Sequence, residues 1–196
     1  SPTVAKYVIE DLDGRVEMII DGGFSAIGLE STIIDLSGGE PMILRPGYVT
    51  QEKMTQVIGN VDVDRTILDA SSKEAPKAPG MKYRHYAPNA EVLVAEGAPR
   101  RAASRIAREY DARAAQGQRC IIFATEQTRA LYSGRQYVII GDRKEPATLC
   151  ANLFAQLRAH SDDVDVILAE GLPEQGEGLA YMNRLLRAAG FHVLSE

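Results

Sequence analysis

The sequence predicts an α/β protein, and three observations lead to this fold class. Residues 91–196 alternate near-continuous apolar segments with amphipathic segments of helical length. Residues 1–59 contain shorter apolar segments separated by Gly, Pro and Ser, which is typical of strands joined by tight turns. Residues 60–90 carry several prolines, a Ser-Ser pair and no periodic pattern. We therefore expect a β-rich N-terminal part (1–59), an interdomain linker (60–90) and an α/β C-terminal domain (91–196).

The N-terminal part is expected to begin with a helix, because Ser1-Pro2 reads as an N-cap followed by Pro at the first helical position. That helix should end at the turn Asp13-Gly14. Thr50 can cap a second, short helix that stops at Gly59. Three strands are predicted, at residues 16–21, 31–36 and 42–47, and a hairpin-like turn joins the last two.

The C-terminal domain is predicted to be Rossmann-like, with about four strands, because wholly apolar strands that alternate with helices form parallel sheets covered on both faces. Gly117 and Gly190 are expected to end two of its helices. The predicted strands are residues 91–97, 119–125, 136–142 and 164–171, and the predicted helices are residues 99–117, 126–133, 146–161 and 178–190.

Composition argues against several classes of function. The 196 residues carry a formal net charge of −5, which disfavours a general nucleic-acid surface. No apolar run is long enough to span a membrane and no signal peptide is evident, so we expect a cytoplasmic protein. Cys120 and Cys150 lack metal-binding spacing and are interpreted as buried thiols, with a disulfide or a catalytic cysteine as the alternative. The scattered histidines predict no metal site.

The segment GLESTIIDLSGGEPMILRPG, residues 28–47, offers a first candidate site. Ser31 and Thr32 open one predicted strand and Arg45 closes the next. Hydroxyl groups can bind a carboxylate or a ribose, and Arg can hold a phosphate through two parallel hydrogen bonds. The alternative is that the hydroxyls merely begin a strand and that Arg45 is a solvated strand end. If the two strands pair as a hairpin, the hydroxyls and the guanidinium need not lie at the same end of the sheet, so the spacing alone does not establish that they converge.

A second candidate site follows the last predicted strand. Gly171, Gly176 and Gly178 lie between that strand and a helix N-terminus, where open α/β sheets bind ligands. Asn183 and Arg184 lie further along the helix and could face such a ligand, although nearby glutamates would repel a phosphate. A purely structural loop is the alternative interpretation.

Several separate motifs, in this order, resemble the Sua/YciO/YrdC family. The resemblance implies that residues 1–59 are the C-terminal portion of a YrdC-like catalytic domain with a twisted α/β sheet. It also implies that residues 91–196 are the Rossmann-like extension of the long family members. The motifs are SPT (1–3), DGG (21–23), GLESTIIDL (28–36), ILRPG (43–47) and APGMKYRHYAP (78–88).

The resemblance implies an L-threonylcarbamoyladenylate synthase. Such enzymes join L-threonine, bicarbonate or CO₂, and ATP with its Mg²⁺ into threonylcarbamoyl-AMP, and they release pyrophosphate. Partner proteins then transfer the threonylcarbamoyl group to tRNA. Catalysis would come from positioning and charge neutralisation, so no residue is assigned as a general base or other catalytic group.

The family motifs assign binding roles to individual positions of this chain. Ser1 and Arg45 resemble nucleotide-binding residues of the family, and Ser31, with its neighbour Thr32, resembles its threonine-binding position. One of two tyrosines in residues 78–88, either Tyr83 or Tyr86, resembles a linker contact to the nucleotide. The linker would therefore also act as a lid over the nucleotide.

The chain departs from the family pattern at its beginning. Family members carry a Lys-x-Arg element and a Ser-x-Asn element upstream of SPT, and this sequence starts after both. We therefore predict that the chain alone is catalytically inactive and that its longer parent is active. The alternatives are a non-catalytic regulatory or partner-binding module, and an RNA-binding module that uses Lys82 and Arg84. The acidic net charge argues against strong direct nucleic-acid binding.

Overall fold

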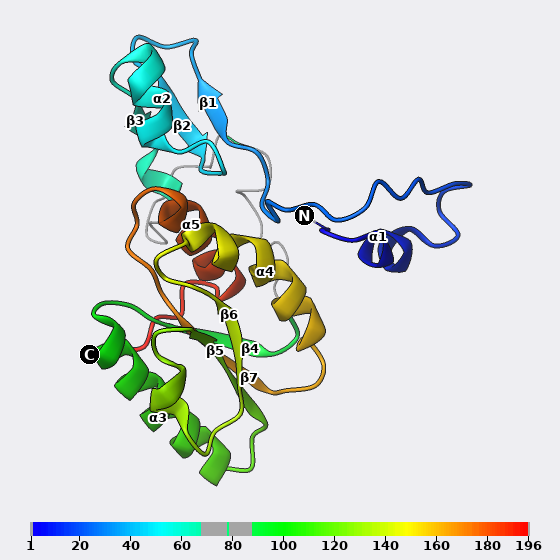
Figure 1. Cartoon of the computed structure of the whole chain (residues 1–196), viewed down its shortest axis with the longest axis vertical. Coiled ribbons are helices and arrows are strands. Elements are labelled where there is room, and N and C mark those ends of the chain that lie inside the picture. The colour runs from blue at the N-terminus through cyan, green and yellow to red at the C-terminus, as the bar shows by residue number, and fades with distance from the viewer. Residues whose placement is uncertain (1, 68–77, 79–87, 196) are drawn as a thin grey trace.

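Two separate β-sheets organise the computed structural model of the chain, which describes residues 2–67, 78 and 88–195. In Figure 1 the smaller sheet lies at the top beside helix α2 (Gln51–Ile58), and the larger sheet lies below it with helices on both faces. Helices α4 (Pro146–Ala159) and α5 (Glu177–Ala188) lie between the two sheets. The mixed α/β class predicted from the sequence is confirmed.

The first helix, α1 (Ala5–Leu12), is present but begins later than predicted. Its N-cap is Val4, which has an extended backbone and offers no side-chain cap, so the predicted start at Ser1-Pro2 is wrong. The strand predicted at residues 16–21 is also wrong, because these residues pair with no strand. Met18 and Ile20 are 78% and 87% exposed. An apolar segment becomes a strand only where a partner strand and a covering layer meet it.

The smaller sheet contains β1 (Ile33–Asp35), β2 (Met42–Arg45) and β3 (Asp62–Val63). Strands β1 and β2 are antiparallel, which confirms the predicted hairpin, and β2 and β3 are parallel. Strand β3 and the short 3₁₀ turn η1 (Arg65–Ile67) fall within residues 60–90, the range predicted as linker. The sheet therefore extends past residue 59, while the domain boundaries themselves remain predictions.

Helix α2 begins and ends as its sequence indicates. The hydroxyl of Thr50 accepts a hydrogen bond from the backbone N–H of Lys53, as expected of an N-cap. Gly59 follows the helix with a φ of +83°, a conformation that costs glycine little. This element holds the chain that leads from β2 to β3.

The larger sheet is parallel throughout and has the strand order β4-β7-β5-β6. Every residue of β5 and β7 is buried, which explains why these strands are apolar along their whole length. The predicted Rossmann-like sheet of about four strands is confirmed. The strands are β4 (Glu91–Ala95), β5 (Cys120–Thr125), β6 (Tyr137–Gly141) and β7 (Val166–Glu170).

Helices cover both faces of this sheet. Helix α3 (Pro99–Ala115) packs on one face together with the 3₁₀ turn η2 (Arg129–Tyr132), which replaces the longer helix predicted at residues 126–133. Helices α4 and α5 pack on the other face. Within the described ranges, no helix is both long and apolar enough to cross a membrane.

Helix α5 differs from the other helices because it is buried on nearly all sides. Residues 178–186 are all buried, and they include the polar residues Asn183 and Arg184. One side of α5 packs against the larger sheet, and the other contacts the segments that flank the smaller sheet. A helix buried on all sides is typical of a core element rather than a covering layer.

Candidate functional site

The hairpin brings the beginning of β1 and the end of β2 together. Ile33 pairs with Arg45, so the residues just before β1 lie beside the Arg45 side chain. The Nε of Arg45 donates to the backbone oxygen of Ser31 over 3.1 Å, and its Nη2 donates to the Ser31 hydroxyl over 3.3 Å. The sequence left open whether these groups converge, and the structure brings Ser31 and Arg45 together, because an antiparallel pair sets the start of one strand beside the end of the other.

The Ser31–Arg45 contact lies where a ligand can reach it. Ser31 is exposed and Arg45 is only half-buried. A hydroxyl and a guanidinium at one strand end offer hydrogen-bond donors for a carboxylate or a phosphate. The structure therefore brings together two of the predicted binding residues, and the roles assigned to them remain predictions.

The third predicted residue of this region, Thr32, makes a structural contact. Its hydroxyl donates to the backbone oxygen of Val49 over 2.7 Å, which ties the start of β1 to the loop after β2. Gly47 in that loop lies directly against the same segment, since a Cβ at this position would be 2.5 Å from the Thr32 backbone nitrogen and 2.6 Å from the Glu30 oxygen. The two loops are thus packed backbone against backbone.

Arg184 of α5 contacts these loops and Asn183 contacts the η1 turn, instead of facing a ligand at the edge of the large sheet. The Nε of Arg184 donates to the Glu30 carboxylate over 2.6 Å, and its Nη2 donates to the backbone oxygen of Pro46 over 3.0 Å. The Nδ2 of Asn183 donates to the backbone oxygen of Ile67 over 2.7 Å. Sequence reasoning singled out this Asn-Arg pair but placed it at a different site.

The ion pair sets the charge state of Glu30. Burial acts to raise the pKa of this carboxyl group, but the charge and the hydrogen bond of Arg184 outweigh it and hold the pKa below its usual value of 4.5. Glu30 is therefore ionised at neutral pH. The segment that leads into Ser31 is anchored by a charged hydrogen bond.

A cavity of about 210 Å³ lies next to the two loops, between them and helices α4 and α5. Its walls are mostly apolar and include Ile27, Leu29 and Ala180, so it does not suit a carboxylate or a phosphate. Cys150 also lines it, and burial raises the pKa of this thiol to about 12. Both Cys150 and Cys120 are buried and free, as predicted.

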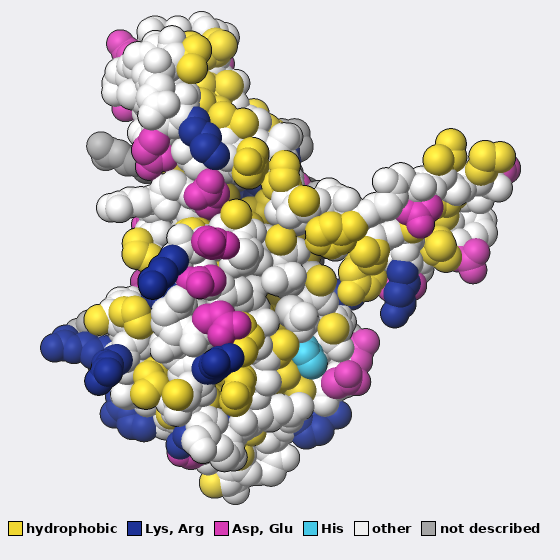
Figure 2. All heavy atoms as spheres, viewed as in Figure 1, with side chains coloured by type: hydrophobic (Ala, Val, Ile, Leu, Met, Phe, Trp, Pro, Cys, Tyr) yellow, Lys and Arg dark blue, Asp and Glu magenta, His cyan; other side chains and the backbone are white. Residues whose placement is uncertain are grey.

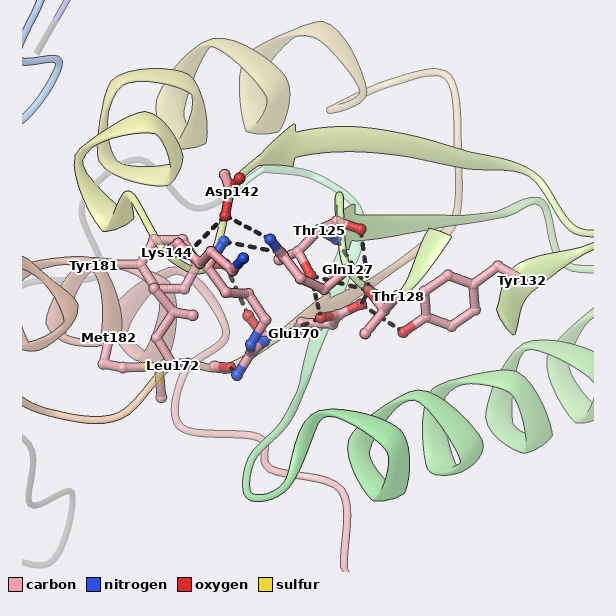
Figure 3. Close-up of polar contacts among 12 residues, drawn as sticks. Thr125, Gln127, Thr128, Tyr132, Asp142, Lys144, Glu170, Leu172, Tyr181 and Met182 are labelled. Carbon is pink, nitrogen blue, oxygen red and sulfur yellow. Dashed lines mark hydrogen bonds and ion pairs between the residues drawn. The ribbon is translucent and has the colours of Figure 1, made fainter. Parts of the chain in front are cut away.

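The second candidate site, at the carboxyl edge of the large sheet, is filled by side chains of the protein itself (Figure 3). The carboxylate of Glu170 is fully buried and accepts hydrogen bonds from the hydroxyls of Thr125, Thr128 and Tyr132 and from the guanidinium of Arg143. Such a satisfied network favours the structural interpretation of this edge. Sequence reasoning missed it, although a Thr-x-x-Thr segment that begins at the last residue of β5 and an Arg after β6 were available as signals.

Other predicted binding residues lie outside the described residues. These are Ser1, Tyr83 and Tyr86, and the same holds for Lys82 and Arg84, so their roles remain predictions. In the part of the chain that the structure describes, no group of three or more His, Cys, Asp or Glu could hold a metal ion.

Two protein-family models together match nearly the whole chain. Residues 49–190 match the family described as threonylcarbamoyl-AMP synthase, C-terminal domain. Residues 1–47 match the Sua5/YciO/YrdC family, described as telomere recombination.

Similar proteins from other organisms are named threonylcarbamoyl-AMP synthase. The threonylcarbamoyl-AMP synthase of Bacillus subtilis is 42% identical over 195 residues, which cover 99% of this chain and 55% of the relative. That of Pyrococcus abyssi is 44% identical over 197 residues, with the same coverage. The crystal structure of P. abyssi Sua5 complexed with L-threonine is 40% identical, covers 99% of this chain and 55% of that chain, and gives a TM-score of 0.87. The chain thus spans about half the length of these relatives.

Proposed function

Because the chain belongs to the Sua/YciO/YrdC family, in the form that carries the threonylcarbamoyl-AMP synthase C-terminal domain, we propose that its full-length protein makes threonylcarbamoyl-AMP. The substrates are L-threonine, bicarbonate or CO₂, and ATP with Mg²⁺, and the products are threonylcarbamoyl-AMP and pyrophosphate. The product supplies the threonylcarbamoyl group that partner proteins transfer to tRNA.

The contact between Arg45 and Ser31 is the observation that carries this proposal. It sets a hydroxyl and a fixed positive charge side by side at an accessible strand end. L-threonine presents a carboxylate and ATP presents phosphates, and both are the partners that such groups bind. The solved relative named above was crystallised with L-threonine, and it shares the fold over 99% of this chain.

The reaction asks the protein mainly to position its substrates. The threonine amine forms a C–N bond with the bicarbonate carbon and water leaves, which gives a carbamate. A carbamate oxygen then attacks the α-phosphorus of ATP, and the bond to the β-phosphate oxygen breaks to release pyrophosphate. Ser31 would orient the threonine carboxylate, and Arg45 would neutralise charge on the phosphates as pyrophosphate departs.

The proposal is tested with the full-length protein, labelled L-threonine, bicarbonate and ATP. We expect threonylcarbamoyl-AMP and pyrophosphate to form in equal amounts and only when all three substrates are present. Pyrophosphate release that does not require threonine would contradict the proposal. The 196-residue chain alone is assayed beside it, and there we expect no product, because Arg45 by itself cannot neutralise both a carboxylate and a triphosphate.

A further inference from the structure

We propose that Arg184 of helix α5 is a positioning residue that holds both predicted substrate-binding segments in register. The inference rests on the proposed function and deepens it. It gives the C-terminal domain a direct part in shaping the site, although the binding residues themselves lie in the N-terminal part.

The contacts of Arg184 reach the two segments at equivalent points. Glu30, which accepts from its Nε, immediately precedes Ser31. Pro46, whose backbone oxygen accepts from its Nη2, immediately follows Arg45. One planar guanidinium therefore holds the residue before the predicted threonine contact and the residue after the predicted phosphate contact.

The network around Arg184 is buried and continuous. Arg184 is 6% exposed and Asn183 is fully buried. The third arm of the guanidinium, Nη1, donates to the Asn183 side-chain oxygen, and the Asn183 nitrogen donates to the Ile67 backbone oxygen. Lysine cannot reproduce this arrangement, because a single ammonium lacks the fixed fork that serves three acceptors at once.

The segment before β1 needs this support because the sheet does not supply it. The pairing of β1 with β2 shifts register between Ile33 and Ile34, so the ladder is irregular where β1 begins. Residues 30–32 are held instead by Arg184, by the Arg45 hydrogen bonds and by the close approach of Gly47. Displacing binding groups by about 1 Å costs on the order of 100-fold in rate, so loss of Arg184 should affect substrate binding and turnover.

A matched pair of variants in the full-length protein separates positioning from general stability. Arg184→Met keeps a flexible apolar side chain and removes the guanidinium with its hydrogen bonds. Arg187→Met removes the same charge one turn later on α5, where the guanidinium donates to the Thr66 backbone oxygen over 3.5 Å and lies over the Phe191 ring. The KM values for L-threonine and ATP should rise at least about 10-fold in the first variant and less than about 2-fold in the second. Arg184→Lys should lie between Arg184→Met and the unmodified protein.

Hydrogen exchange gives a second readout that does not depend on activity. Backbone amides of residues 28–34 and 42–49 should exchange faster in Arg184→Met and unchanged in Arg187→Met. Equal losses of binding in the two Met variants, or unchanged exchange in Arg184→Met, would overturn the inference. If the unmodified protein makes no adenylate, the proposed function fails, and the exchange pattern still decides the role of Arg184. If Arg184→Met does not fold, the same exchange and KM comparison is made with Arg184→Lys, and values equal to those of the unmodified protein would overturn the inference.

Discussion

Arg45 donates two hydrogen bonds to Ser31, one to the backbone oxygen and one to the hydroxyl. The guanidinium therefore has a defined orientation before any substrate arrives, and the hydroxyl is held beside it. Preorganised groups of this kind lose little freedom when a ligand binds. From this contact we predict different effects of substitutions on the binding of ATP and of L-threonine.

Arg45→Lys should raise the KM for ATP, because an ammonium cannot contact Ser31 and a phosphate with the same fixed geometry. A lost hydrogen bond to a charged group costs about 1.5–3 kcal/mol, which corresponds to roughly 10- to 150-fold. Ser31→Ala should raise the KM for L-threonine more than that for ATP. Steady-state kinetics of the full-length protein measure both values, with Arg15→Lys, an exposed position, as the control. An unchanged KM for ATP in Arg45→Lys would remove the phosphate role.

Gly47→Ala should destabilise the N-terminal part, because the new Cβ would lie 2.5 Å from the backbone nitrogen of Thr32. Backbone atoms cannot move aside cheaply, so we expect a loss of about 1–3 kcal/mol in the free energy of unfolding. Gly38→Ala is the matched control, since a Cβ there meets nothing within 4 Å, and its effect should stay within about 0.5 kcal/mol. Urea unfolding of both variants measures the difference, and equal stabilities would contradict the close approach.

The ion pair between Glu30 and Arg184 predicts a pH dependence. Since the pKa of Glu30 in the folded protein lies below its usual value of 4.5, the pair contributes stability above that pH, and the contribution is lost as the pH falls through the folded pKa. In Arg184→Met the lowering effect of Arg184 is lost, so the pKa of Glu30 lies higher than in the unmodified protein. The destabilisation caused by Arg184→Met should therefore shrink as the pH falls toward and below the usual value of 4.5. Denaturant unfolding of Arg184→Met and of the unmodified protein, above and below this pH, checks the prediction. If the difference between their free energies of unfolding stays constant, the pair does not titrate as described.

Arg143→Met should destabilise the C-terminal domain strongly. It removes the cation that lies 3.1 Å from the fully buried Glu170 carboxylate, and breaking such a pair costs about 3–5 kcal/mol. Arg129→Met removes an exposed ion pair with Glu126 on the same side of the sheet and should cost less than about 1 kcal/mol. Thermal and urea unfolding rank the two variants, and similar losses in both would argue against the importance of the buried network.

The two thiols should be unreactive in the folded protein. Burial raises the pKa of Cys150 to about 12 and also raises that of Cys120, so neither is a thiolate at neutral pH. An aromatic disulfide reagent should label neither cysteine before unfolding and both after it. Rapid labelling of one cysteine in the native protein would show that the residues packed over its thiol move away readily.

The sequence predicted the C-terminal domain better than the N-terminal part, because the pattern of its buried strands is visible within each strand's own residues. Strands such as β5 are apolar throughout because both faces are covered, and that pattern is visible in a short window. Residues 16–21 show a similar apolar pattern but meet no partner strand, and nothing within the segment reveals this. Strand formation depends on distant residues as well as on composition.

Only part of the candidate site could be predicted, because some of its residues are close in sequence and others are far apart. Ser31 and Arg45 belong to one hairpin, so their chemistry could be read from adjacent motifs. The partners of Arg184 are separated from it by 154 positions at Glu30 and by 138 at Pro46. No periodicity or spacing rule links residues so far apart, and only the docking of α5 brings them together. The Glu170 network joins this carboxylate to residues 27 to 45 positions before it, and the Thr-x-x-Thr and Arg signals do not show by themselves that these residues converge.

The burial of α5 on nearly all sides also limits how the molecule can move. In the view of Figure 2 the upper and lower parts of the molecule are continuous in the region where Figure 1 places α4 and α5. Opening a hinge between them would expose Arg184 and Asn183 and break three hydrogen bonds that cross the junction. Hinges form where few buried contacts are broken, so we expect substrates to enter and products to leave through local loop movements, while α5 and the strands it contacts remain fixed to one another.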